Sequence, residues 1–598
     1  MILRRTALSL LLASACVPAF AADAQIDLAS INDATVSPRF IVKYRDGSAE
    51  RVQPAARQRA LDAAADRARP QMGAKFAAQR GSTMLRVQSL RATTGGKHVV
   101  KASQRLTRTE AEALMRSIAS DPNVEYVGVD RIMRATAQPN DQVFLSHQMW
   151  HYGTGVGGAR VTAAWDAGAT GAGVVVAVLD TGVTHHEDLE PNLLPGYDFI
   201  TDGDMSRRGT DERAPGGWDR GDYAAAGDCG AGSPASNSSW HGSHVSGTIA
   251  EVTNNVIGGA GVAPNAKVLP VRVLGRCGGY TSDINDAIVW AAGGHVDGVP
   301  DNTTPAEVIN MSLGGDHACD VDTQAAINTA VSLGTTVVVA AGNDNSDVAT
   351  HAPASCANVI TVGATGAGGQ RAGYSNFGPG VDVSAPGGAG VEGIPQGYIW
   401  STVNVSTQAP DDGPTGDRYG GMTGTSMASP HVAGVVALMQ SVAPTPLPPS
   451  AVEGLLKASA RPFGVKPEMG KPIGAGIIDA AAAADRARTF GQPLAGTPLL
   501  LNVAQAAPAL AFGQTVQYAL EVPDGANRLE ITTYGGRGTV AAYAAYEAEP
   551  TATANVGAST RPGTNQVINI TTPGAGHYYI KVTATAASSG VMVRARVL

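Results

Sequence analysis

The chain has 598 residues, too many for one core at the usual ~100–200 residues per domain, so we expect three or four units. Hydrophobic residues make up 43% of the chain and charged residues only 16%, which excludes a disordered or highly charged protein and favours a globular one. The formal net charge of −8 conceals two regions of opposite sign.

The N-terminus carries the three parts of a secretory signal peptide. Arg4-Arg5 precede an apolar run over residues 7–12 and the small-residue cleavage site Ala19-Phe20-Ala21. We therefore predict removal of residues 1–21 and export of the rest. A stable membrane anchor is not expected, because spanning a bilayer needs ~20 apolar residues and the sequence offers no run of that length.

Residues 22–137 form the next predicted unit, in which a helix lies between strands over 39–44 and 124–129. Residues 39–136 hold 19 Lys and Arg against 9 Asp and Glu, whereas residues 137–598 carry a net charge of −17. Opposite charges favour association between the two parts of the chain. The arginines are spread through predicted helices, so we expect no nucleic-acid binding.

Three glycine-rich segments supply an acid, an imidazole and a hydroxyl: DTG from Asp180, HGSHVSGT from His241 and GTSMASPHVAG from Gly424. A serine hydroxyl is a weak nucleophile at pH 7, so an imidazole must take its proton and a buried carboxylate must orient that imidazole. Asp180 ends the apolar strand 174–179, which suits a buried acid. DTG alone recurs by chance and in aspartic proteases, but three segments in the order Asp, His, Ser predict a serine nucleophile.

Apolar strands alternate with helical stretches over residues 138–490. Two of the strands, 308–311 and 335–341, lead to glycine-bearing turns, and the second turn contains Asn343. The alternation predicts an α/β domain with a mostly parallel sheet and helices on both faces. Strands buried on both faces are expected to read as continuous apolar runs, as these do.

The serine segment leads into a predicted helix over residues 429–439. Ser426 would then lie in the loop that enters this helix, where such folds expose reactive groups. Pro430 would fall in the first turn, where a missing N–H costs little because first-turn N–H groups have no partner within the helix.

The pattern changes again near the C-terminus. Residues 486–497 read as a linker, and beyond them short alternating strands over 516–522, 566–570 and 577–583 predict a small β-sandwich over 499–598. This domain carries no catalytic cluster.

The three segments resemble those of the subtilisin-like serine proteases, in particular the thermitase-like secreted bacterial branch, over about residues 141–484. The resemblance implies that Asp180, His241 and Ser426 are the catalytic triad of a serine endopeptidase. It also implies that the amide of Asn343 and the backbone N–H of Ser426 bind the oxyanion.

The resemblance places the substrate along two glycine-bearing edges, where an extended peptide adds as a strand. The implied edge residues are Gly278, Gly279 and Tyr280 on one side and Ser312, Leu313 and Gly314 on the other. The pocket for the P1 side chain, which precedes the cleaved bond, would be lined by Ala340, Ala341 and Gly342. Asp344 and His351 are expected close enough to this pocket to influence which side chain enters.

The flanking units resemble known partners of such proteases. From about residue 39, residues 22–137 resemble the inhibitory propeptide of subtilisin-like zymogens, an α+β unit, which implies self-cleavage between Ala135 and Gln138. Residues 499–598 resemble the C-terminal prepeptidase domains of secreted bacterial proteases.

Four cysteines remain after Cys16 leaves with the signal peptide. An even number in an exported protein suggests two disulfides, for which three pairings are available, and no CxxC spacing favours zinc instead. The resemblance implies the pairs Cys229–Cys277 and Cys319–Cys356.

Structural Ca²⁺ is also implied, since residues 252–259 resemble the tight calcium loop of the thermitase-like branch. The implied ligands are the carboxylates of Asp141 and Asp188, the side-chain oxygen of Asn255 and the backbone carbonyls of Val252, Ile257 and Gly259. A second candidate is the acidic insert with Asp202, Asp204, Asp211, Asp219 and Asp222, for which a solvated loop is an equal alternative.

These features predict a secreted, self-processing serine endopeptidase that cleaves proteins and peptides and acts as a monomer. One alternative stays open, a binding or adhesion protein that uses a protease-like scaffold without turnover. Nothing in adhesion requires Asp180, His241, Ser426 and Asn343 together.

Overall fold

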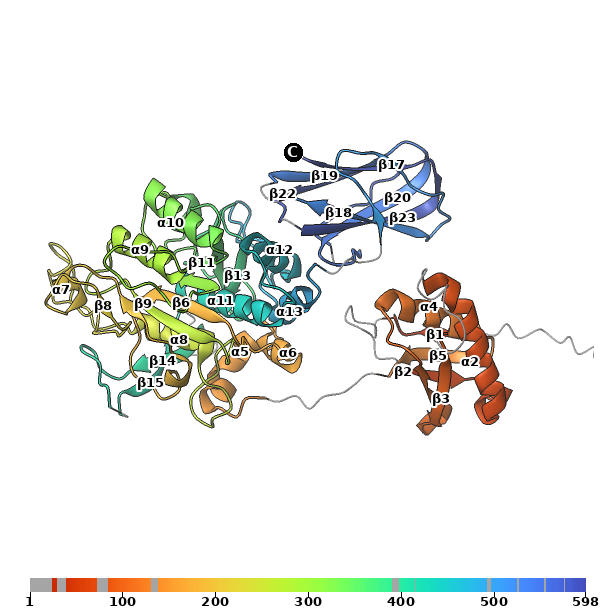
Figure 1. The fold of residues 1–598 in the computed structure, drawn as a ribbon, viewed down its shortest axis with the longest axis horizontal. Coiled ribbons are helices and arrows are strands. Elements are labelled where there is room, and N and C mark those ends of the chain that lie inside the picture. The colour runs from red at the N-terminus through yellow and green to blue at the C-terminus, as the bar shows by residue number, and fades with distance from the viewer. Residues whose placement is uncertain are drawn as a thin grey trace, which may run out of the picture. The chain divides into compact units, whose positions relative to one another are not determined.

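The computed structural model describes residues 24–28, 39–72, 84–130, 138–389, 397–413, 415–491, 496–523, 526–552, 555–574 and 576–598. The chain divides into two compact units, Met1–Ala135 and Thr136–Leu598. The predicted signal peptide, residues 1–21, and residues 135–137 of the predicted cleavage region lie outside the described residues. Figure 1 shows the elements.

The first unit is an α+β domain on a five-stranded sheet of order β1-β5-β2-β4-β3. Its elements are β1 (Gln25–Ile26), β2 (Arg39–Tyr44), α1 (Ala49–Val52), α2 (Pro54–Ala68), β3 (Val87–Ala92), β4 (Lys97–Ala102), α4 (Arg108–Ala119) and β5 (Val124–Val129). Helix α4 starts with a capping box, in which Thr107 and Glu110 each bond the other's backbone N–H. Alternate residues Phe40 and Val42 of β2 join Leu114 of α4 in the core.

The second unit holds an eight-stranded sheet of order β13-β12-β11-β10-β6-β9-β7-β8. Its strands are β6 (Val175–Asp180), β7 (Tyr197–Asp198), β8 (Ala214–Pro215), β9 (Lys267–Arg272), β10 (Val308–Met311), β11 (Thr336–Ala340), β12 (Ile360–Thr365) and β13 (Val383–Pro386). All neighbouring strands run parallel except β7 and β8. The predicted fold class, a mostly parallel α/β sheet, is confirmed.

Helices cover both faces of this sheet (Figure 1). The helices of this part are α5 (Met149–Tyr152), α6 (Val161–Asp166), α7 (Gly203–Ser206), α8 (His241–Ala250), α9 (Thr281–Ala291), α10 (Val321–Ser332), α11 (Thr425–Val442), α12 (Pro449–Ser459) and α13 (Ala480–Arg488). Val176 and Val178 of β6 pack with α8 and α11, whereas Ala177 and Leu179 pack with α9 and α10. Alternate side chains of this one strand thus contribute to the hydrophobic cores on the two faces of the sheet. An antiparallel ribbon of β14 (Ile399–Asn404) and β15 (Asp417–Met422) packs against α8.

Helix α11 is longer than the sequence predicts. It begins at Thr425 rather than at residue 429, so Ser426 is its second residue and does not lie in a preceding loop. Pro430 is therefore the sixth residue, beyond the first turn, and its missing N–H leaves the carbonyl of Ser426 without its partner within the helix. The hydroxyl of Ser312 donates to that carbonyl at 2.8 Å, which compensates for the loss.

Residues 497–597 form a β domain of two sheets, with orders β16-β18-β23-β20-β21 and β17-β24-β19-β22. The strands are β16 (Thr497–Pro498), β17 (Gln505–Ala506), β18 (Thr515–Val522), β19 (Arg528–Tyr534), β20 (Arg537–Tyr546), β21 (Gly557–Ser559), β22 (Gln566–Thr571), β23 (Gly576–Ser589) and β24 (Met592–Val597). Leu529 and Ile531 of one sheet share a core with Leu520 and Ile580 of the other. The two sheets agree with the predicted β-sandwich.

Candidate active site

Asp180 and His241 meet where β6 ends and α8 begins. Asp180 is fully buried, and Nδ1 of His241 lies 2.8 Å from its Oδ1 and 3.0 Å from its Oδ2. The backbone N–H of Thr181 donates to the same Oδ1 at 2.7 Å. Trp240 turns the chain into α8 with a φ of 53°, a left-handed conformation that non-glycine residues rarely adopt. The carboxylate therefore holds the imidazole in one orientation.

The surroundings of His241 favour its protonated form. Burial alone would lower the pKa of His241, but the charge and hydrogen bond of Asp180, with smaller effects of Asp222 and Asp219, outweigh burial and raise that pKa above its ordinary value. An imidazolium that forms when His241 accepts a proton is consequently stabilised.

Further buried groups lie behind Asp180. The hydroxyl of Thr181 donates to Oδ2 of Asp219 at 2.7 Å and accepts from the backbone N–H of Gly242 at 3.0 Å. Nε of the fully buried Arg272 donates to the carbonyl of Thr181 at 3.1 Å. Thr181 thus ties the end of β6 to both α8 and β9.

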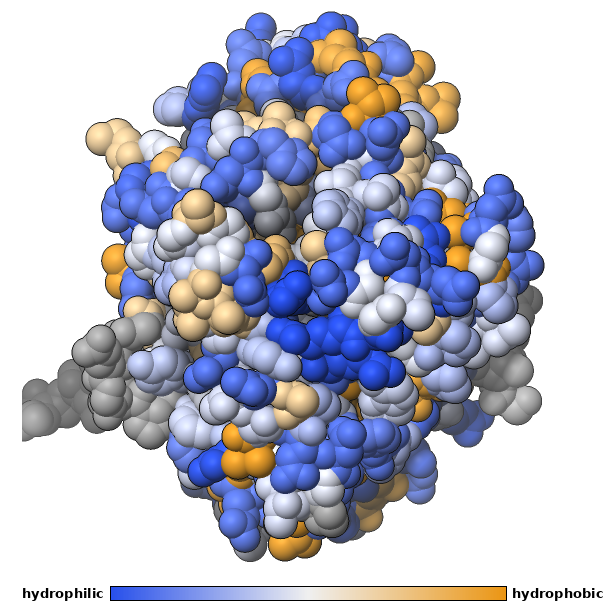
Figure 2. All heavy atoms as spheres, turned by 90° about the vertical axis from the view of Figure 1, so that its left-hand side faces the viewer, coloured by the Kyte–Doolittle hydropathy of each residue, from blue (hydrophilic) through white to orange (hydrophobic). Residues whose placement is uncertain are grey.

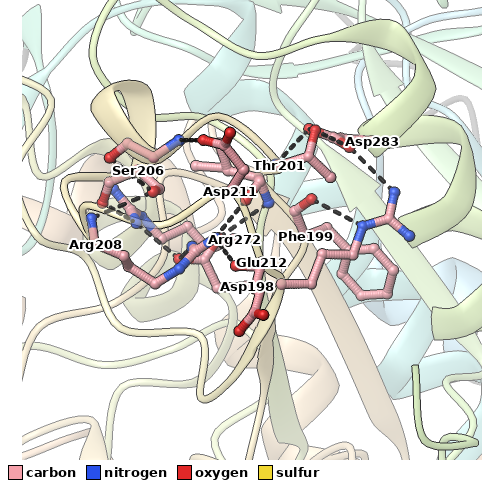
Figure 3. A network of polar contacts seen from close by, with 12 residues as sticks. Asp198, Phe199, Thr201, Ser206, Arg208, Asp211, Glu212, Arg272 and Asp283 are labelled. Atoms are coloured by element: carbon pink, nitrogen blue, oxygen red, sulfur yellow. Dashed lines mark hydrogen bonds and ion pairs between the residues drawn. The ribbon is translucent and has the colours of Figure 1, made fainter. Parts of the chain in front are cut away.

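Figure 3 shows that Arg272 belongs to a larger polar network. Its guanidinium also donates to Oδ2 of Asp198 at 2.8 Å and to the carbonyl of Ser206 at 2.8 Å, and Arg208 pairs with the same Asp198 carboxylate. These side chains are almost completely buried. Removing one partner would leave an uncompensated buried charge, so the network holds the segment around α7 firmly against β9.

Ser426 is tied to the end of β10 by two hydrogen bonds. Its hydroxyl donates to the carbonyl of Ser312 at 3.3 Å, and the hydroxyl of Ser312 donates back to the carbonyl of Ser426. The other serine of the segment, Ser429, is fully buried and donates to Oδ1 of Asn310 at 2.6 Å. Of the two serines, only Ser426 has a partly accessible environment.

Asn343 is exposed, but one end of its amide is fixed. Its Oδ1 accepts from the backbone N–H of Thr425 at 2.8 Å and from the Thr425 hydroxyl at 3.0 Å. The Nδ2 group therefore points away from Thr425. A Cβ atom placed on Gly424 would lie 3.5 Å from that Nδ2 and 3.5 Å from the backbone nitrogen of Ser426. Two N–H donors thus flank one small space beside Ser426, which glycine leaves open.

The predicted substrate edges differ in exposure. The exposed or half-exposed residues are Gly278, Gly279, Tyr280, Leu313 and Gly314, and the buried ones are Ser312, Ala340, Ala341 and Gly342. Ala341 packs in the core between the sheet and α9 and α10, so only its backbone can face a substrate. The turn at Gly278 is held by backbone hydrogen bonds between Gly275 and Gly278 in both directions, at 2.8 and 3.1 Å.

Two disulfide bonds brace the loops on these edges. Cys229 is bonded to Cys277, next to the Gly278 turn, and Cys319 is bonded to Cys356, in the loops that follow β10 and β11. These are the pairs that the resemblance implies. Each bond joins segments that lie 48 or 37 residues apart in the sequence, so both restrict the unfolded chain.

The loop over residues 252–259 wraps around two fully buried carboxylates, those of Asp141 and Asp188. Asp141 accepts from the backbone N–H groups of residues 254–256, and Asp188 accepts from the Gly259 N–H at 3.2 Å. Within the described ranges neither carboxylate has a Lys or Arg partner. The carbonyls of Val252, Ile257 and Gly259 accept no hydrogen bond there.

Asn255 departs from its implied role, because its amide presents nitrogen rather than oxygen to Asp188, at 2.6 Å. Sequence reasoning also missed two groups here. Tyr419 of β15 donates to Asp188 at 3.0 Å, and the fully buried Glu251 accepts from Gln148 at 3.0 Å. Burial raises the pKa of Asp188 to about 7 and that of Glu251 to about 8, so these anions are destabilised unless a cation joins them.

The acidic insert does not gather its carboxylates at one point. Asp202 caps α7, Asp211 accepts from the Gly203 N–H, Asp219 binds Thr181, and Asp222 accepts from the Ser239 N–H at 2.7 Å. Asp202 and Asp211 thus stabilise a local helix end and turn, and Asp219 and Asp222 bond other segments near the triad. The insert is best described as a capped acidic loop, and the second calcium candidate finds no support.

A polar recess of about 550 Å³ lies beside this insert. Its lining includes Val183, Arg207, Trp218 and Asp219. Figure 2 views the molecule from the side that carries α7 and β8, and this surface is mostly hydrophilic with scattered apolar residues. Asp219, which lines the recess, bonds the hydroxyl of Thr181, and Thr181 directly follows Asp180 in the chain. The recess is therefore connected to the Asp180 site.

Comparison with known proteins agrees with this geometry. The model of the subtilase family matches residues 171–492, and that of the bacterial pre-peptidase C-terminal domain matches residues 515–584. An extracellular protease of Xanthomonas campestris pv. campestris is 48% identical over 603 residues, covering 98% of this chain and 96% of that protein.

Two further relatives point the same way. An extracellular basic protease of Dichelobacter nodosus is 43% identical and covers 77% of this chain and 73% of its own length. A solved structure described as a protease from Pseudoalteromonas arctica is 50% identical with a TM-score of 0.56, covering 59% of this chain and 100% of that one. No helix within the described part of the chain has the length and apolar character to cross a membrane. The chain therefore belongs to the subtilase family and is an extracellular serine protease.

Proposed function

We propose that the protein is an endopeptidase in which Ser426 is the nucleophile, His241 the general base and Asp180 the residue that orients His241. The observation that carries this proposal is the paired contact of His241 Nδ1 with both oxygens of the buried Asp180, at 2.8 and 3.0 Å. It leaves Nε2 of the imidazole as the atom that takes the Ser426 proton.

In the first step Ser426 Oγ attacks the peptide carbonyl as its proton passes to His241. The carbonyl oxygen becomes negative and accepts hydrogen bonds from Nδ2 of Asn343 and the backbone N–H of Ser426, which flank the space beside Gly424. The intermediate collapses to an acyl-enzyme when the leaving amine takes the proton from His241. Water, deprotonated by the same imidazole, then releases the acyl group and restores Ser426.

The substrate lies as an extended strand between two backbone edges, Gly278–Tyr280 and Ser312–Gly314. Support comes from the exposure of Gly278, Tyr280 and Gly314 and from the disulfides that hold both edges. The P1 side chain enters beside Gly342, whose missing Cβ lets Asn376 and His351 pack closely against the backbone at this point. Ala340 and Ala341 contribute backbone to this pocket.

We further propose that the protein is made as a zymogen. Residues 1–21 are the signal peptide, residues 22–137 a propeptide that inhibits the enzyme, and residues 138–490 the protease domain, followed by the C-terminal domain over 499–598. The charges of +10 and −17 on the two sides of the cleavage region favour inhibition by association. The active enzyme is a monomer.

The test is covalent labelling by a fluorophosphonate, which reacts with serines activated by a neighbouring base. We expect one adduct per chain, and mass spectrometry of the digested protein should locate it on Ser426. His241→Ala should abolish labelling, because the hydroxyl is then no longer activated. An unlabelled wild-type chain that also fails to cleave casein would contradict the proposal and favour the binding-scaffold alternative.

Structural calcium is the second part of the proposal. Asp141 and Asp188, with the carbonyls of Val252, Ile257 and Gly259 and the side-chain oxygen of Asn255 after its amide rotates, would hold the ion. The donor set consists of oxygens alone, which Ca²⁺ prefers, and the ion would supply the positive charge that the buried carboxylates lack. It stabilises the loop and takes no part in the chemistry.

Removal of calcium should destabilise the mature enzyme. If the free ion is at about 1,000 times its Kd, binding contributes ~4 kcal/mol, and EDTA should lower the Tm of Ser426-blocked enzyme by roughly 8 °C. The Asp188→Asn variant is the control, because its Tm should start lower and respond little to EDTA. Equal melting of the wild type in calcium and in EDTA would refute the site.

Two buried histidines should make a contribution to the stability of the protease that is lost in acid. His244 and His431 are fully buried, and burial is the main cause that lowers the pKa of His244 to about 3 and that of His431 to about 4. The unfolded imidazoles bind protons below about pH 6.5 whereas the folded ones do not, so stability is full above that pH and falls as the pH drops toward 4.

Each of the two histidines should lower the free energy of unfolding by roughly 2 kcal/mol when the pH falls from 6.5 to 5. Urea unfolding of Ser426→Ala, which prevents self-digestion, at pH 7.5, 6.5 and 5.0 measures the effect. Asp188, Glu251 and Asp219, whose pKa values burial raises, act in the opposite direction, so the effect of the histidines is the difference in pH dependence between this chain and the same chain with His431→Gln. An equal pH dependence in the two chains would refute the role of His431.

A further inference from the structure

A second cluster of ligand-type side chains lies outside the triad and outside the proposed calcium loop. It consists of Asp316, Asp344 and His351, whose ligand atoms all lie within 4.8 Å of one another. Among the described residues this is the one group of three His, Cys, Asp or Glu side chains with that spacing. Both carboxylates are exposed, so a cation can reach them from solvent.

The histidine of this cluster is the informative member. His351 is only 8% exposed, and its Nδ1 is buried without a hydrogen-bond partner among the residues that the structure describes. Nδ1 faces Oδ1 of Asp316 at 3.4 Å and Oδ2 of Asp344 at 3.8 Å, distances too long for hydrogen bonds. Two ligand atoms that are each ~2.0–2.1 Å from a tetrahedral metal ion stand roughly 3.4 Å apart. The spacing thus suits ligands of a shared ion better than an imidazole–carboxylate pair.

The backbone that carries the three side chains is held in place. Gly315 and Ala352, which adjoin Asp316 and His351, exchange backbone hydrogen bonds at 2.9 and 3.0 Å. The Cys319–Cys356 disulfide links the same two segments, and the N–H of Asp344 donates to Oδ1 of Asn376 at 2.9 Å. A site of this kind needs little rearrangement to bind an ion.

We propose that Asp316, Asp344 and His351 bind Zn²⁺, with water in the fourth position. One imidazole nitrogen and two carboxylate oxygens are a borderline donor set that suits Zn²⁺, whereas Ca²⁺ prefers six to eight oxygens. Within the described residues no Lys or Arg forms an ion pair with either carboxylate. The ion would therefore neutralise two negative charges at this position.

The cluster is coupled to the P1 pocket through the other end of the imidazole. A Cβ atom on Gly314 would clash with Nε2 of His351, and one on Gly342 would lie 2.8 Å from it. Binding of Zn²⁺ to Nδ1 leaves the proton on Nε2, which then faces the pocket as a donor. Zinc should thus disfavour a cationic P1 side chain. This second step rests on the proposed endopeptidase function.

The binding step is tested on the secreted protein after treatment with diisopropyl fluorophosphate to stop self-digestion. Calorimetric titration with Zn²⁺ in excess calcium should give one site per chain. His351→Gln removes a direct ligand and should weaken binding by more than the ~10–100-fold that loss of an outer-shell partner costs. Asp316→Asn gives the same test if His351→Gln misfolds. The matched control is His295→Gln, an exposed histidine next to Asp297 and Asp301, which should leave this site intact.

Absence of Zn²⁺ binding in the wild type, or binding lost in His295→Gln and kept in His351→Gln, would overturn the site. The coupling is tested by kcat/KM for peptides with Lys or Phe at P1. Zinc should lower the Lys-to-Phe ratio in the wild type and leave it unchanged in His351→Gln. Binding without a change in the ratio would overturn the coupling alone. A chain that cleaves neither peptide would refute the endopeptidase function, while the titration still decides the site.

Discussion

Replacing Ser426 with alanine should lower kcat for a peptide substrate by on the order of 10⁶-fold, the effect of losing the triad serine in subtilisin. In the proposed mechanism Ser426 Oγ forms the acyl-enzyme, and its buried neighbour Ser429 donates to Asn310 and cannot take its place. The same variant should remain at its full length after removal of the signal peptide if, as proposed, the first bond that the enzyme cleaves is its own.

Peptide hydrolysis and N-terminal sequencing of secreted material measure both effects. The matched control is Ser332→Ala, an exposed serine of α10 that should behave as the wild type. Normal loss of residues up to about 137 in the Ser426→Ala chain would show that another protease performs the maturation. Residual hydrolysis within tenfold of the wild type would exclude Ser426 as the nucleophile.

The sequence could predict the position of Asp180, His241 and Ser426 because each sits next to glycines at the end of a regular element. A short motif there encodes both the side chain and the turn that positions it. The parallel sheet was equally predictable, since continuous apolar strands such as Thr336–Ala340 can only be buried on both faces. Both kinds of signal are local in the chain.

Partners far apart in the chain left no such signal. Tyr419 reaches Asp188 across 231 residues, and Ser312 meets Ser426 across 114. The start of α11 was misplaced for the same reason. Pro430 argues locally for a nearby helix start, and only the Ser312 hydroxyl, supplied by another strand, makes a proline at the sixth position acceptable.

Charged residues were predicted least well, because the same residue types cap turns and bind ions. In the acidic insert Asp202 and Asp211 satisfy backbone N–H groups, as the solvated-loop alternative allows. Of the proposed zinc cluster, the sequence predicts only that Asp344 and His351 lie near the P1 pocket, and not that they bind a metal. Asp316 joins them through the backbone pairing of Gly315 with Ala352, which follows from the fold and not from spacing.

Asp180→Asn should lower kcat by on the order of 10⁴-fold with little loss of stability, because the amide has the size of the carboxylate. The reason lies in the N–H of Thr181, which donates to Oδ1 at 2.7 Å. It would hold the oxygen of the new amide at the Oδ1 position, 2.8 Å from Nδ1 of His241, and place the NH₂ group at the Oδ2 position, 3.0 Å from the same nitrogen. An imidazole that accepts the amide N–H carries its proton on Nε2 and cannot accept one from Ser426, and in either tautomer the negative charge that stabilises the imidazolium is gone.

The pH profile separates this explanation from simple misfolding. Activity of Asp180→Asn should stay low through neutral pH, while its Tm should match that of the wild type. Asp219→Asn is the control, since Asp219 contacts Thr181 and not His241. Burial raises the pKa of Asp219 to about 7, which favours a neutral group at this position. The activity of Asp219→Asn should fall far less than that of Asp180→Asn. Equal losses in the two variants would mean that the negative charge near His241, and not the tautomer set by Asp180, governs the reaction.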